Sequence, residues 1–324
     1  MKYSAIVIGL GQIGMGYDFD ASPEEFITTH AQALDFHNGF NLYGGVDVDV
    51  QSRQRFTEKF GKPAFLNHID AIKELQPELV VISVPTDYHL SILENILCVY
   101  TPKLVLIEKP LSYHSSEANQ IFEIASTNNP PIAVNYFREF EPVYRDVLSK
   151  IEDGFIGFPL KVVVHYTKGI VNNGSHFIRY ISNFMEDFID LKIIEKGRSW
   201  NEEDPEPDIQ IKFDQGLAYF IAHEEENFSY YEMELIGPKG KLRFSNLGSV
   251  IEHWDIIDDP DFEDYRILSE KPSIYKPDFN KYQKYVYNNI YNYLQGEDSL
   301  YCDINSMDQT LKIYESLEKE LANA

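Results

Sequence analysis

Short apolar runs alternate with longer amphipathic stretches over the first 135 residues. The apolar runs predict strands at 5–8, 40–46, 62–65, 78–84, 103–107 and 132–135. The stretches between them predict helices at 29–36, 51–60, 68–75, 90–99 and 116–127. Strands and helices that alternate in this way predict a doubly wound parallel sheet, in which ligands bind at the carboxyl ends of the strands.

The pattern changes after about residue 135. Helical patterns at 139–152 and 174–184 flank an alternating strand at 160–166. Tight turns then connect strands at 191–196, 208–214, 217–223, 229–236, 240–245 and 249–256. Helices at 279–294 and 304–322 close the chain. This order predicts an α+β domain with a large, mostly antiparallel open sheet, so we expect domains at 1–130 and 131–324, with the last helices able to pack back on the first domain.

The first predicted strand runs directly into Gly9, Gly11 and Gly14, which have G-x-G-x-x-G spacing. The first glycine permits a tight turn and the second lets the main chain approach a pyrophosphate. The third lets the following helix pack closely on the strand. With Gln12 and Ile13 inside it, this turn predicts a dinucleotide site, and the alternative is a glycine-rich turn without a ligand.

The second predicted strand ends in an acidic residue, Asp47. A carboxylate at this place binds the adenosine ribose hydroxyls and repels a 2′-phosphate, which predicts NAD rather than NADP. Asp47 follows Gly9 by 38 residues, more than the usual separation of about 20. A polar, acidic segment at 17–27 accounts for the excess. Asp49 is the nearby alternative ligand.

The composition narrows the choice of partners and compartment. The formal net charge of −24 over 324 residues argues against nucleic acid and against an anionic membrane surface. The two cysteines have no metal-like spacing, no apolar run is long enough to span a bilayer, and only Lys2 precedes the first strand, so we expect a cytoplasmic protein without a metal site. The acidic patches at 202–208 and 258–264 are expected to be solvated loops.

Several motifs together resemble the Gfo/Idh/MocA oxidoreductases, the glucose–fructose oxidoreductase and inositol dehydrogenase family. Besides the glycine turn, they are Thr29-His30-Ala31, Val46-Asp47, Pro85-Thr86-x-x-His89, Glu108-Lys109-Pro110 and Glu234-Leu-Ile-Gly-x-x-Gly240. The resemblance implies an NAD(P)-binding Rossmann domain and a second domain whose open sheet pairs protomers into dimers or tetramers. It also implies hydride transfer at a carbon of a sugar, cyclitol or sugar nucleotide.

Lys109 matches the active-site lysine of this family. An ammonium beside the oxygen of the reacting carbon polarises a carbonyl or lowers the pKa of a hydroxyl. The alternative is a solvated surface lysine. The resemblance implies that Glu108 positions the cofactor or the lysine, and that Pro85, Thr86 and His89 border the nicotinamide. His89 is alternatively an ordinary residue at a helix start.

The acid–base segment departs from the family pattern of Asp, His four residues later and Asp three beyond. Here Asn172, His176 and Arg179 occupy these places. His176 is the candidate base. The alternative is that His176 is a residue at the start of a helix, hydrogen-bonded to the backbone. Asn172 is the candidate for positioning a substrate hydroxyl. Arg179, Lys168 and Arg138 are the candidates for holding a phosphate or carboxylate, unless they are surface or ion-paired residues.

These features predict an NAD-dependent oxidoreductase that moves a hydride to or from a ring carbon of a sugar or nucleotide-activated sugar. The string Asn172-Asn-Gly-Ser-His176 resembles family members that are encoded with surface-polysaccharide genes. Two alternatives stay open. One is a redox-neutral enzyme, such as an epimerase, that recycles tightly bound NAD. The other is an NAD-bound sensor that has lost catalysis, which the loss of both acidic positions favours.

Overall fold

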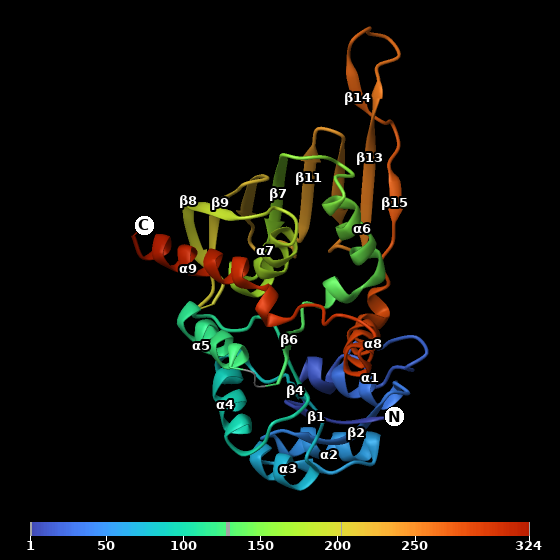
Figure 1. The fold of residues 1–324 in the computed structure, drawn as a ribbon, viewed down its shortest axis with the longest axis vertical. Helices are drawn as coiled ribbons and strands as arrows, with labels where there is room; N and C mark the ends of the chain where they lie inside the picture. The colour runs from blue at the N-terminus through green and yellow to red at the C-terminus, as the bar shows by residue number, and fades with distance from the viewer. Residues whose placement is uncertain (1, 128–129, 202, 324) are drawn as a thin grey trace. The chain divides into compact units, whose positions relative to one another are not determined.

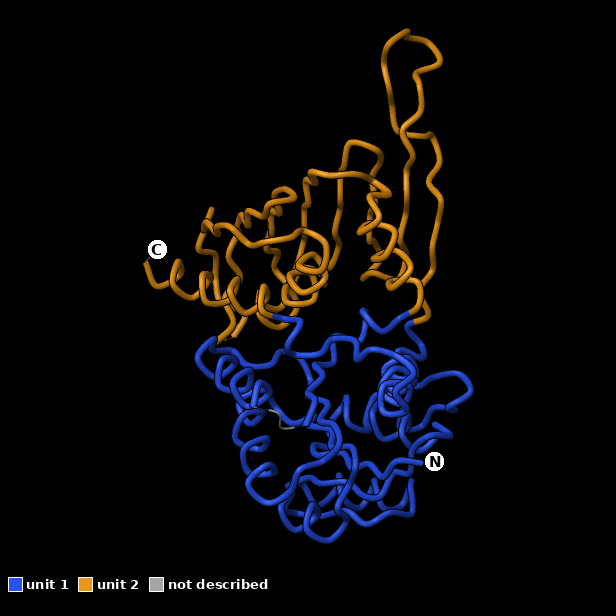
Figure 2. Tube along the Cα trace, viewed as in Figure 1, with its two compact units in different colours: residues 1–141, 279–307 blue, residues 142–278, 308–324 orange. Residues whose placement is uncertain are grey.

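The computed structural model describes residues 2–127, 130–201 and 203–323. The chain forms two compact units, coloured separately in Figure 2. Unit 1 comprises residues 1–141 and 279–307, and unit 2 comprises residues 142–278 and 308–324. Residues 131–141 and 279–307, which the sequence pattern assigns to the second domain, therefore belong to the unit that carries the glycine turn.

Unit 1 contains a parallel sheet in the order β3-β2-β1-β4-β5-β6 (Figure 1). The strands are β1 (Tyr3–Ile8), β2 (Phe40–Val46), β3 (Ala64–Phe65), β4 (Leu79–Ile82), β5 (Leu104–Ile107) and β6 (Ile132–Val134). Every residue of β1, β4 and β5 is buried, because helices cover both faces of the sheet. The predicted doubly wound parallel sheet is confirmed.

The helices of unit 1 are α1 (His30–Phe36), α2 (Val50–Phe60), α3 (His68–Leu75), α4 (His89–Val99), α5 (Ser115–Ser126) and α8 (Tyr282–Gln295). Short helical turns are η1 (Gln12–Gly16), η2 (Thr86–Tyr88), η3 (Phe137–Phe140), η5 (Phe279–Lys281) and η6 (Ile304–Ser306). A single π-helical turn, η1, follows the glycine turn, and the helix predicted at 29–36 is observed as α1.

The segment between η1 and α1 is held at both of its ends. The buried Asp18 carboxylate accepts hydrogen bonds from the Thr28 and Thr29 backbone N–H groups at 2.6 and 3.0 Å. The Tyr282 hydroxyl donates to the Thr28 carbonyl at 2.7 Å, and the Ile27 N–H donates to the Asn280 carbonyl at 2.8 Å. This polar insertion is therefore fixed against the start of α8.

Unit 2 contains a nine-stranded sheet in which β14-β13-β12-β11-β7-β10-β9-β8 are neighbours and β15 pairs with β13. The strands are β7 (Leu160–Tyr166), β8 (Phe188–Ser199), β9 (Pro205–Phe213), β10 (Gly216–Ala222), β11 (Glu232–Gly237), β12 (Gly240–Ser245), β13 (Val250–Asp258), β14 (Arg266–Leu268) and β15 (Ser273–Tyr275). All pairs are antiparallel except β7 with β10. The predicted mostly antiparallel sheet is confirmed, and β14 and β15 are additional strands.

The helices of unit 2 are α6 (Pro142–Glu152), α7 (Ser175–Ser182) and α9 (Asp308–Asn323), and a π-helical segment, η4 (Gly169–Gly174), precedes α7. Burial alternates along the central strand β7, where Val162 and Val164 are buried and Val163 is partly exposed. One face of the sheet therefore packs on the core and the other stays open. No helix in the described ranges has the length and apolar character that a bilayer crossing requires.

One expectation about loops is wrong. Residues 202–208 are not a solvated loop, although residue 202 lies outside the described residues. Asp204 and Glu206 are 0% and 2% exposed, and β9 begins at Pro205. Both carboxylates accept backbone hydrogen bonds from the turn at 169–172, which explains why they tolerate burial. The second acidic patch, between β13 and β14, is exposed as predicted.

Candidate functional site

A cavity of about 690 Å³ lies in unit 1 at the carboxyl ends of β1, β2 and β4. Four of the predicted cofactor residues line it: Gly9, Gly11, Asp47 and Pro85. The remaining lining residues are Ile8, Val46, Val48, Ser52, Leu66, His68, Ser83, Val84, Tyr88, Ser91, Ile92 and Asn95. Of the other predicted cofactor residues, Gln12, Ile13 and Gly14 belong to the adjoining turn η1 and Thr86 begins η2.

The three glycines have different surroundings. Gly9 has φ +97°, and a Cβ there would lie 2.5 Å from the Ser83 carbonyl oxygen. A Cβ on Gly14 would lie 2.0 Å from the Gly9 carbonyl oxygen. A Cβ on Gly11 would meet nothing within 4 Å. Gly9 and Gly14 therefore allow backbone to pack on backbone, whereas Gly11 opens into the cavity where a ligand can approach the main chain.

The Asp47 carboxylate is held in the cavity wall by two backbone groups. Its Oδ2 accepts the Leu10 N–H at 2.7 Å and its Oδ1 accepts the Asp49 N–H at 2.8 Å. Asp49, the alternative ligand, instead caps α2 by accepting the Ser52 N–H and hydroxyl at 2.8 and 2.9 Å. These hydrogen bonds lower the pKa of the Asp49 carboxyl. A glycine turn, an open Gly11 and a fixed Asp47 in one cavity fit a dinucleotide.

Seven of the lining residues carry no motif that the sequence analysis could use: Ser52, Leu66, His68, Tyr88, Ser91, Ile92 and Asn95. They come from α2, the segment before α3, α3, η2 and α4. Side chains such as Leu66 and Ile92 supply an apolar surface, and no spacing rule connects them along the chain. Only the folded sheet edge brings them together.

Glu108 and Lys109 directly follow β5. Glu108 is only 8% exposed, and its carboxylate accepts hydrogen bonds from His30 Nε2 at 2.8 Å, Asn135 Nδ2 at 2.5 Å and the Lys109 N–H at 3.2 Å. Burial raises the pKa of the Glu108 carboxyl, but the interaction with His30 and the hydrogen bond from Asn135 outweigh it, so this pKa lies below its ordinary value. Lys109 is partly exposed, and its peptide bond to Pro110 is cis.

His30, Asn135 and Tyr287 are functional candidates that sequence reasoning missed. His30 Nδ1 lies 2.8 Å from the Tyr287 hydroxyl, so a buried chain of contacts runs from α8 through α1 to Glu108. The motif Thr29-His30-Ala31 contributed to the family resemblance, but the sequence analysis assigned no role to His30. Tyr287 gave no signal, because a tyrosine on a helix is usually packing.

His89 begins α4 and is 1% exposed. Its Nδ1 lies 3.2 Å from the Leu111 carbonyl oxygen, and its Nε2 lies 3.1 Å from the Val84 carbonyl oxygen. Burial lowers the pKa of His89 despite these two acceptors. Because both ring nitrogens contact the main chain, this geometry favours a structural link between the turns after β4 and β5 over direct contact with a ligand.

In unit 2, the predicted residues lie on η4 and α7. His176 is 6% exposed and its ring centroid lies 6.2 Å from that of Tyr231. Arg179, one turn later on α7, is 4% exposed. The turn before them is held by Asp204, whose two oxygens accept the Val171 and Asn172 N–H groups at 2.9 and 2.8 Å. The Asn172 side chain donates to the Lys168 carbonyl at 3.1 Å.

The other two predicted basic residues have partners of their own. Lys168 has a left-handed backbone, φ +63°, and its ammonium pairs with Glu225 at 2.8 Å. The Arg138 guanidinium in η3 of unit 1 lies 4.7 Å from the ring centroid of Phe137 and 5.4 Å from that of Phe279. The Lys168 charge is therefore already compensated within unit 2, whereas Arg138 rests on aromatic faces.

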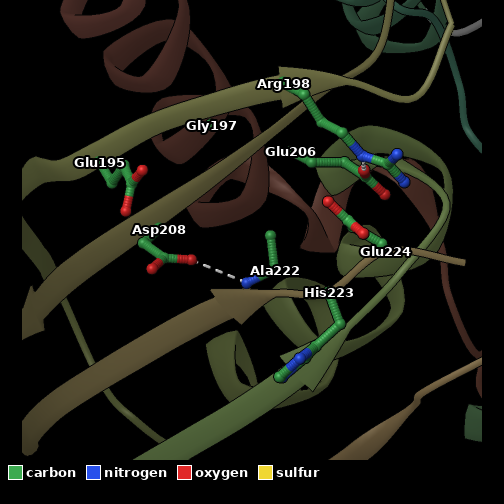
Figure 3. A pocket seen from close by; sticks show the side chains of 8 residues that line it. All are labelled: Glu195, Gly197, Arg198, Glu206, Asp208, Ala222, His223 and Glu224. Atoms are coloured by element: carbon green, nitrogen blue, oxygen red, sulfur yellow. Dashed lines mark hydrogen bonds and ion pairs between the residues drawn. The ribbon is translucent and has the colours of Figure 1, made fainter. Parts of the chain in front are cut away.

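A second cavity, of about 290 Å³, lies at the ends of β8, β9 and β10 in unit 2 (Figure 3). It is lined by Glu195, Gly197, Arg198, Glu206, Asp208, Ala222, His223 and Glu224. Arg198 pairs with Glu206 at 2.8 Å, which leaves a surplus of carboxylates that would repel a phosphate. No predicted site residue lines this cavity. Within the described residues, no group of three or more His, Cys, Asp or Glu side chains could hold a metal ion.

Comparison with known proteins supports this description of unit 1. Residues 4–136 match the Gfo/Idh/MocA sequence model, described as an oxidoreductase family with an NAD-binding Rossmann fold. This match confirms the predicted family resemblance and the class of NAD(P)-dependent oxidoreductases. No curated protein matches the chain significantly in sequence.

Several solved structures share the fold over nearly the whole chain. An NAD-binding oxidoreductase from Klebsiella pneumoniae has a TM-score of 0.78 at 14% identity and covers 100% of this chain and 98% of its own. The WlbA dehydrogenase from Bordetella pertussis, in complex with NADH and UDP-GlcNAcA, has a TM-score of 0.75 at 13% identity, with coverages of 99% and 96%. A 3-ketoreductase variant from Actinomadura kijaniata, in complex with TDP-benzene and NADP, has a TM-score of 0.73 at 15% identity, with coverages of 99% and 98%. At these identities, the similarity establishes the shared fold.

The surroundings of the glycines predict opposite effects for two matched substitutions. Gly11→Ala should leave the melting temperature of the apoprotein unchanged, because its methyl group meets no protein atom, and should weaken dinucleotide binding about tenfold or more. Gly14→Ala should lower the melting temperature itself, because its methyl group collides with the Gly9 carbonyl. Differential scanning fluorimetry with and without NAD(H) checks both. Equal destabilisation of the two apoproteins would contradict this interpretation.

Proposed function

We propose that this protein, whose N-terminal domain belongs to the Gfo/Idh/MocA oxidoreductases, is an NAD-dependent enzyme. It moves a hydride to or from a ring carbon of a sugar or nucleotide-activated sugar. The observation that carries the proposal is the cavity at the end of β1, β2 and β4, which combines the glycine turn with Asp47. We propose surface-polysaccharide biosynthesis as the biological context. This part of the proposal rests only on the sequence Asn172-Asn-Gly-Ser-His176.

NAD is the cofactor that we propose, rather than NADP. The Asp47 carboxylate lines the cavity and would repel a 2′-phosphate. The nearby Arg53 guanidinium donates to the Asp47 and Val48 carbonyl oxygens at 2.8 and 2.9 Å, so it is used in holding the turn. The structural neighbours do not decide the matter, since one is in complex with NADH and another with NADP.

Each unit contributes a candidate group for the chemistry. Bound NAD supplies a hydride acceptor or donor at nicotinamide C4. The Lys109 ammonium, at the carboxyl end of β5, stabilises negative charge that develops on the oxygen of the reacting carbon. His176 exchanges the hydroxyl proton, because an imidazole can gain and lose a proton near neutral pH. Asn172 positions a substrate hydroxyl.

The substrate class rests on two observations. Two structural neighbours were solved with nucleotide-containing ligands, UDP-GlcNAcA and TDP-benzene. We propose that Arg138, Arg179 and Lys168 recognise the phosphate or carboxylate of the substrate, because they are basic residues in a chain of net charge −24. For Lys168, binding the substrate would replace its ion pair with Glu225.

We also propose a cytoplasmic homodimer or homotetramer that assembles through the open face of the unit 2 sheet. Neither Cys98 nor Cys302 forms a disulfide, as a reducing compartment requires. Partly exposed apolar side chains, including Val163 on β7 and Leu217 and Ile221 on β10, lie on adjacent strands of the open face.

The proposed assembly makes a simple prediction about mass. Light scattering of the purified protein should give two or four times the chain mass of 37.6 kDa. Val163→Lys should shift the mass toward the monomer, because it places a charge in the buried interface. Lys73→Glu, on α3 of unit 1, changes charge at an exposed position outside this sheet and serves as the control. A wild-type monomer at micromolar concentration would contradict the assembly.

Cofactor choice should depend on Asp47. The wild-type protein should bind NAD(H) at least about tenfold more tightly than NADP(H), and Asp47→Ser should narrow this ratio because it removes the repelling carboxylate. Asp49→Ser is the matched control, since serine also caps helices and Asp49 does not line the cavity. Titration of intrinsic fluorescence measures the affinity of each of the three proteins for both cofactors. A ratio that moves with Asp49 and not with Asp47 would refute the assignment.

Turnover should depend on Lys109 and His176. Thermal-shift titration with NAD(H), followed by UDP-, GDP- and CMP-sugars, identifies the substrate to be used. Lys109→Met and His176→Gln should each lower kcat by about 10²–10⁴ while NAD affinity changes little.

The controls replace a lysine and a histidine elsewhere. Lys73→Met alters an exposed residue of α3, and His253→Gln alters a buried histidine of unit 2, so both should keep near-wild-type kcat. Absorbance at the NADH band separates net oxidation from a redox-neutral reaction. Failure to bind any dinucleotide would overturn the proposal altogether, and bound NAD without hydride exchange on any sugar would favour the sensor.

A further inference from the structure

A continuous polar chain lies inside unit 1 beneath Lys109. The Tyr287 hydroxyl is 2.8 Å from His30 Nδ1, and His30 Nε2 is 2.8 Å from Glu108 Oε1. Asn135 Nδ2 donates to the same carboxylate oxygen at 2.5 Å. Tyr287 and His30 are both 0% exposed, and Asn135 is 1% exposed. These side chains come from α8, α1 and the end of β6, so three separate segments converge on Glu108.

The donors and acceptors in this chain fit one arrangement. Burial, and then the charge of Glu108, raise the pKa of the Tyr287 hydroxyl well above its usual value, so this hydroxyl keeps its proton. It can donate to His30 Nδ1, which leaves the proton of the neutral imidazole on Nε2, facing Glu108. Glu108 Oε1 then accepts two hydrogen bonds, and Oε2 accepts the Lys109 backbone N–H.

We propose that His30 is a positioning residue for the reaction at Lys109. It holds the Glu108 carboxylate in place through Nε2, and this carboxylate holds the Lys109 backbone through its N–H. The inference rests on the proposed function, because it assigns His30 a positioning role in the reaction proposed for Lys109. Without the bond from His30, a buried carboxyl with fewer donors takes up a proton more readily.

Other ionisable groups surround Glu108 and must be considered with His30. Lys109 favours the ionised carboxyl by its charge. His89 on α4 and Tyr282 on α8 both feel the charge of Glu108, but burial lowers the pKa of His89 and raises that of Tyr282. Both are therefore neutral near pH 7 and neither supplies a competing charge, while the side chains of His30 and Asn135 donate hydrogen bonds to the carboxylate.

The proposal predicts a shift in pH dependence that a purely structural role would not produce. In His30→Leu, the Glu108 pKa should rise by about one unit or more, because burial raises it and a donor is lost. The acid limb of the kcat–pH profile, where activity falls as Glu108 gains a proton, should then move upward by the same amount. His30→Gln keeps an N–H that can reach Glu108 and should restore the wild-type profile.

The experiment measures Glu108 directly as well as through turnover. Carbon-13 NMR of glutamate-labelled protein follows the Glu108 carboxyl during a pH titration, with Glu108→Gln identifying its signal. The kcat profile is recorded on the same variants. His37→Leu is the matched control, because His37 ends α1 and packs on Phe40 and Tyr291 outside the chain of contacts. It should lower stability without moving the titration of Glu108.

Two results would overturn the proposal: an unchanged Glu108 titration in folded His30→Leu, or a His30→Leu that loses kcat equally at every pH. If the leucine variant does not fold, His30→Met fills similar space without a donor and is held to the same criteria. The NMR titration needs no substrate, so it stands if the proposed reaction is wrong. Conversely, wild-type turnover with an unmoved Glu108 titration would reject only the role of His30.

Discussion

Glu108 is a carboxylate that stays ionised although it is almost completely buried, and the arrangement of unit 1 around Lys109 depends on it. An isolated carboxylate in an apolar interior is unfavourable by several kcal/mol, so burial is tolerated only where donors are already in place. Those donors come from α1, from the residue after β6 and from the Lys109 backbone. Displacement of α1 or of β6 would remove one of these donors from the buried charge, which makes their positions interdependent.

In unit 2, buried carboxylates likewise accept hydrogen bonds from backbone N–H groups beside the candidate site residues. Asp204 and Glu206 are buried, and their oxygens accept N–H groups of Gly169, Val171 and Asn172. The turn that leads into α7 and His176 is thus fixed by the carboxylates of Asp204, which directly precedes β9, and of Glu206, which lies on β9. A buried anion that bonds to backbone N–H groups fixes the main chain itself, whereas a contact between two long side chains leaves both backbones free to move.

The sequence allowed the parts of the fold that follow from local rules to be predicted. Continuous apolar runs identified β1, β4 and β5, because strands covered on both faces need no polar alternation. Gly9 and Gly11 were predicted as ligand-binding residues from their spacing, and Asp47 from its place at the end of the second strand; all three line the cavity. A polar segment at 17–27 was predicted between the glycine turn and the first helix, and it lies between η1 and α1.

Long-range partners could not be predicted in this way. His30 and Tyr287 are 257 residues apart, and neither sits in a pattern that names the other. Asp204 and Glu206 lie in an acidic stretch, and high charge ordinarily indicates solvent exposure. Their burial is explained by the backbone donors of a turn more than thirty residues earlier and, for Glu206, also by the Arg198 guanidinium. Residues that bind a ligand can therefore be recognised in the sequence more readily than the residues that position them.

The division of unit 1 into two stretches of chain has a consequence for biosynthesis. Residues 1–141 emerge from the ribosome before all of 142–278, and α8 follows only afterwards. Until then, the nascent chain has the glycine turn and Asp47, but His30 lacks Tyr287 and the insertion before α1 lacks Asn280 and Tyr282. The first stretch therefore cannot complete its fold until α8 has been translated, although the donors to Glu108, which are His30, Asn135 and the Lys109 N–H, all lie within it.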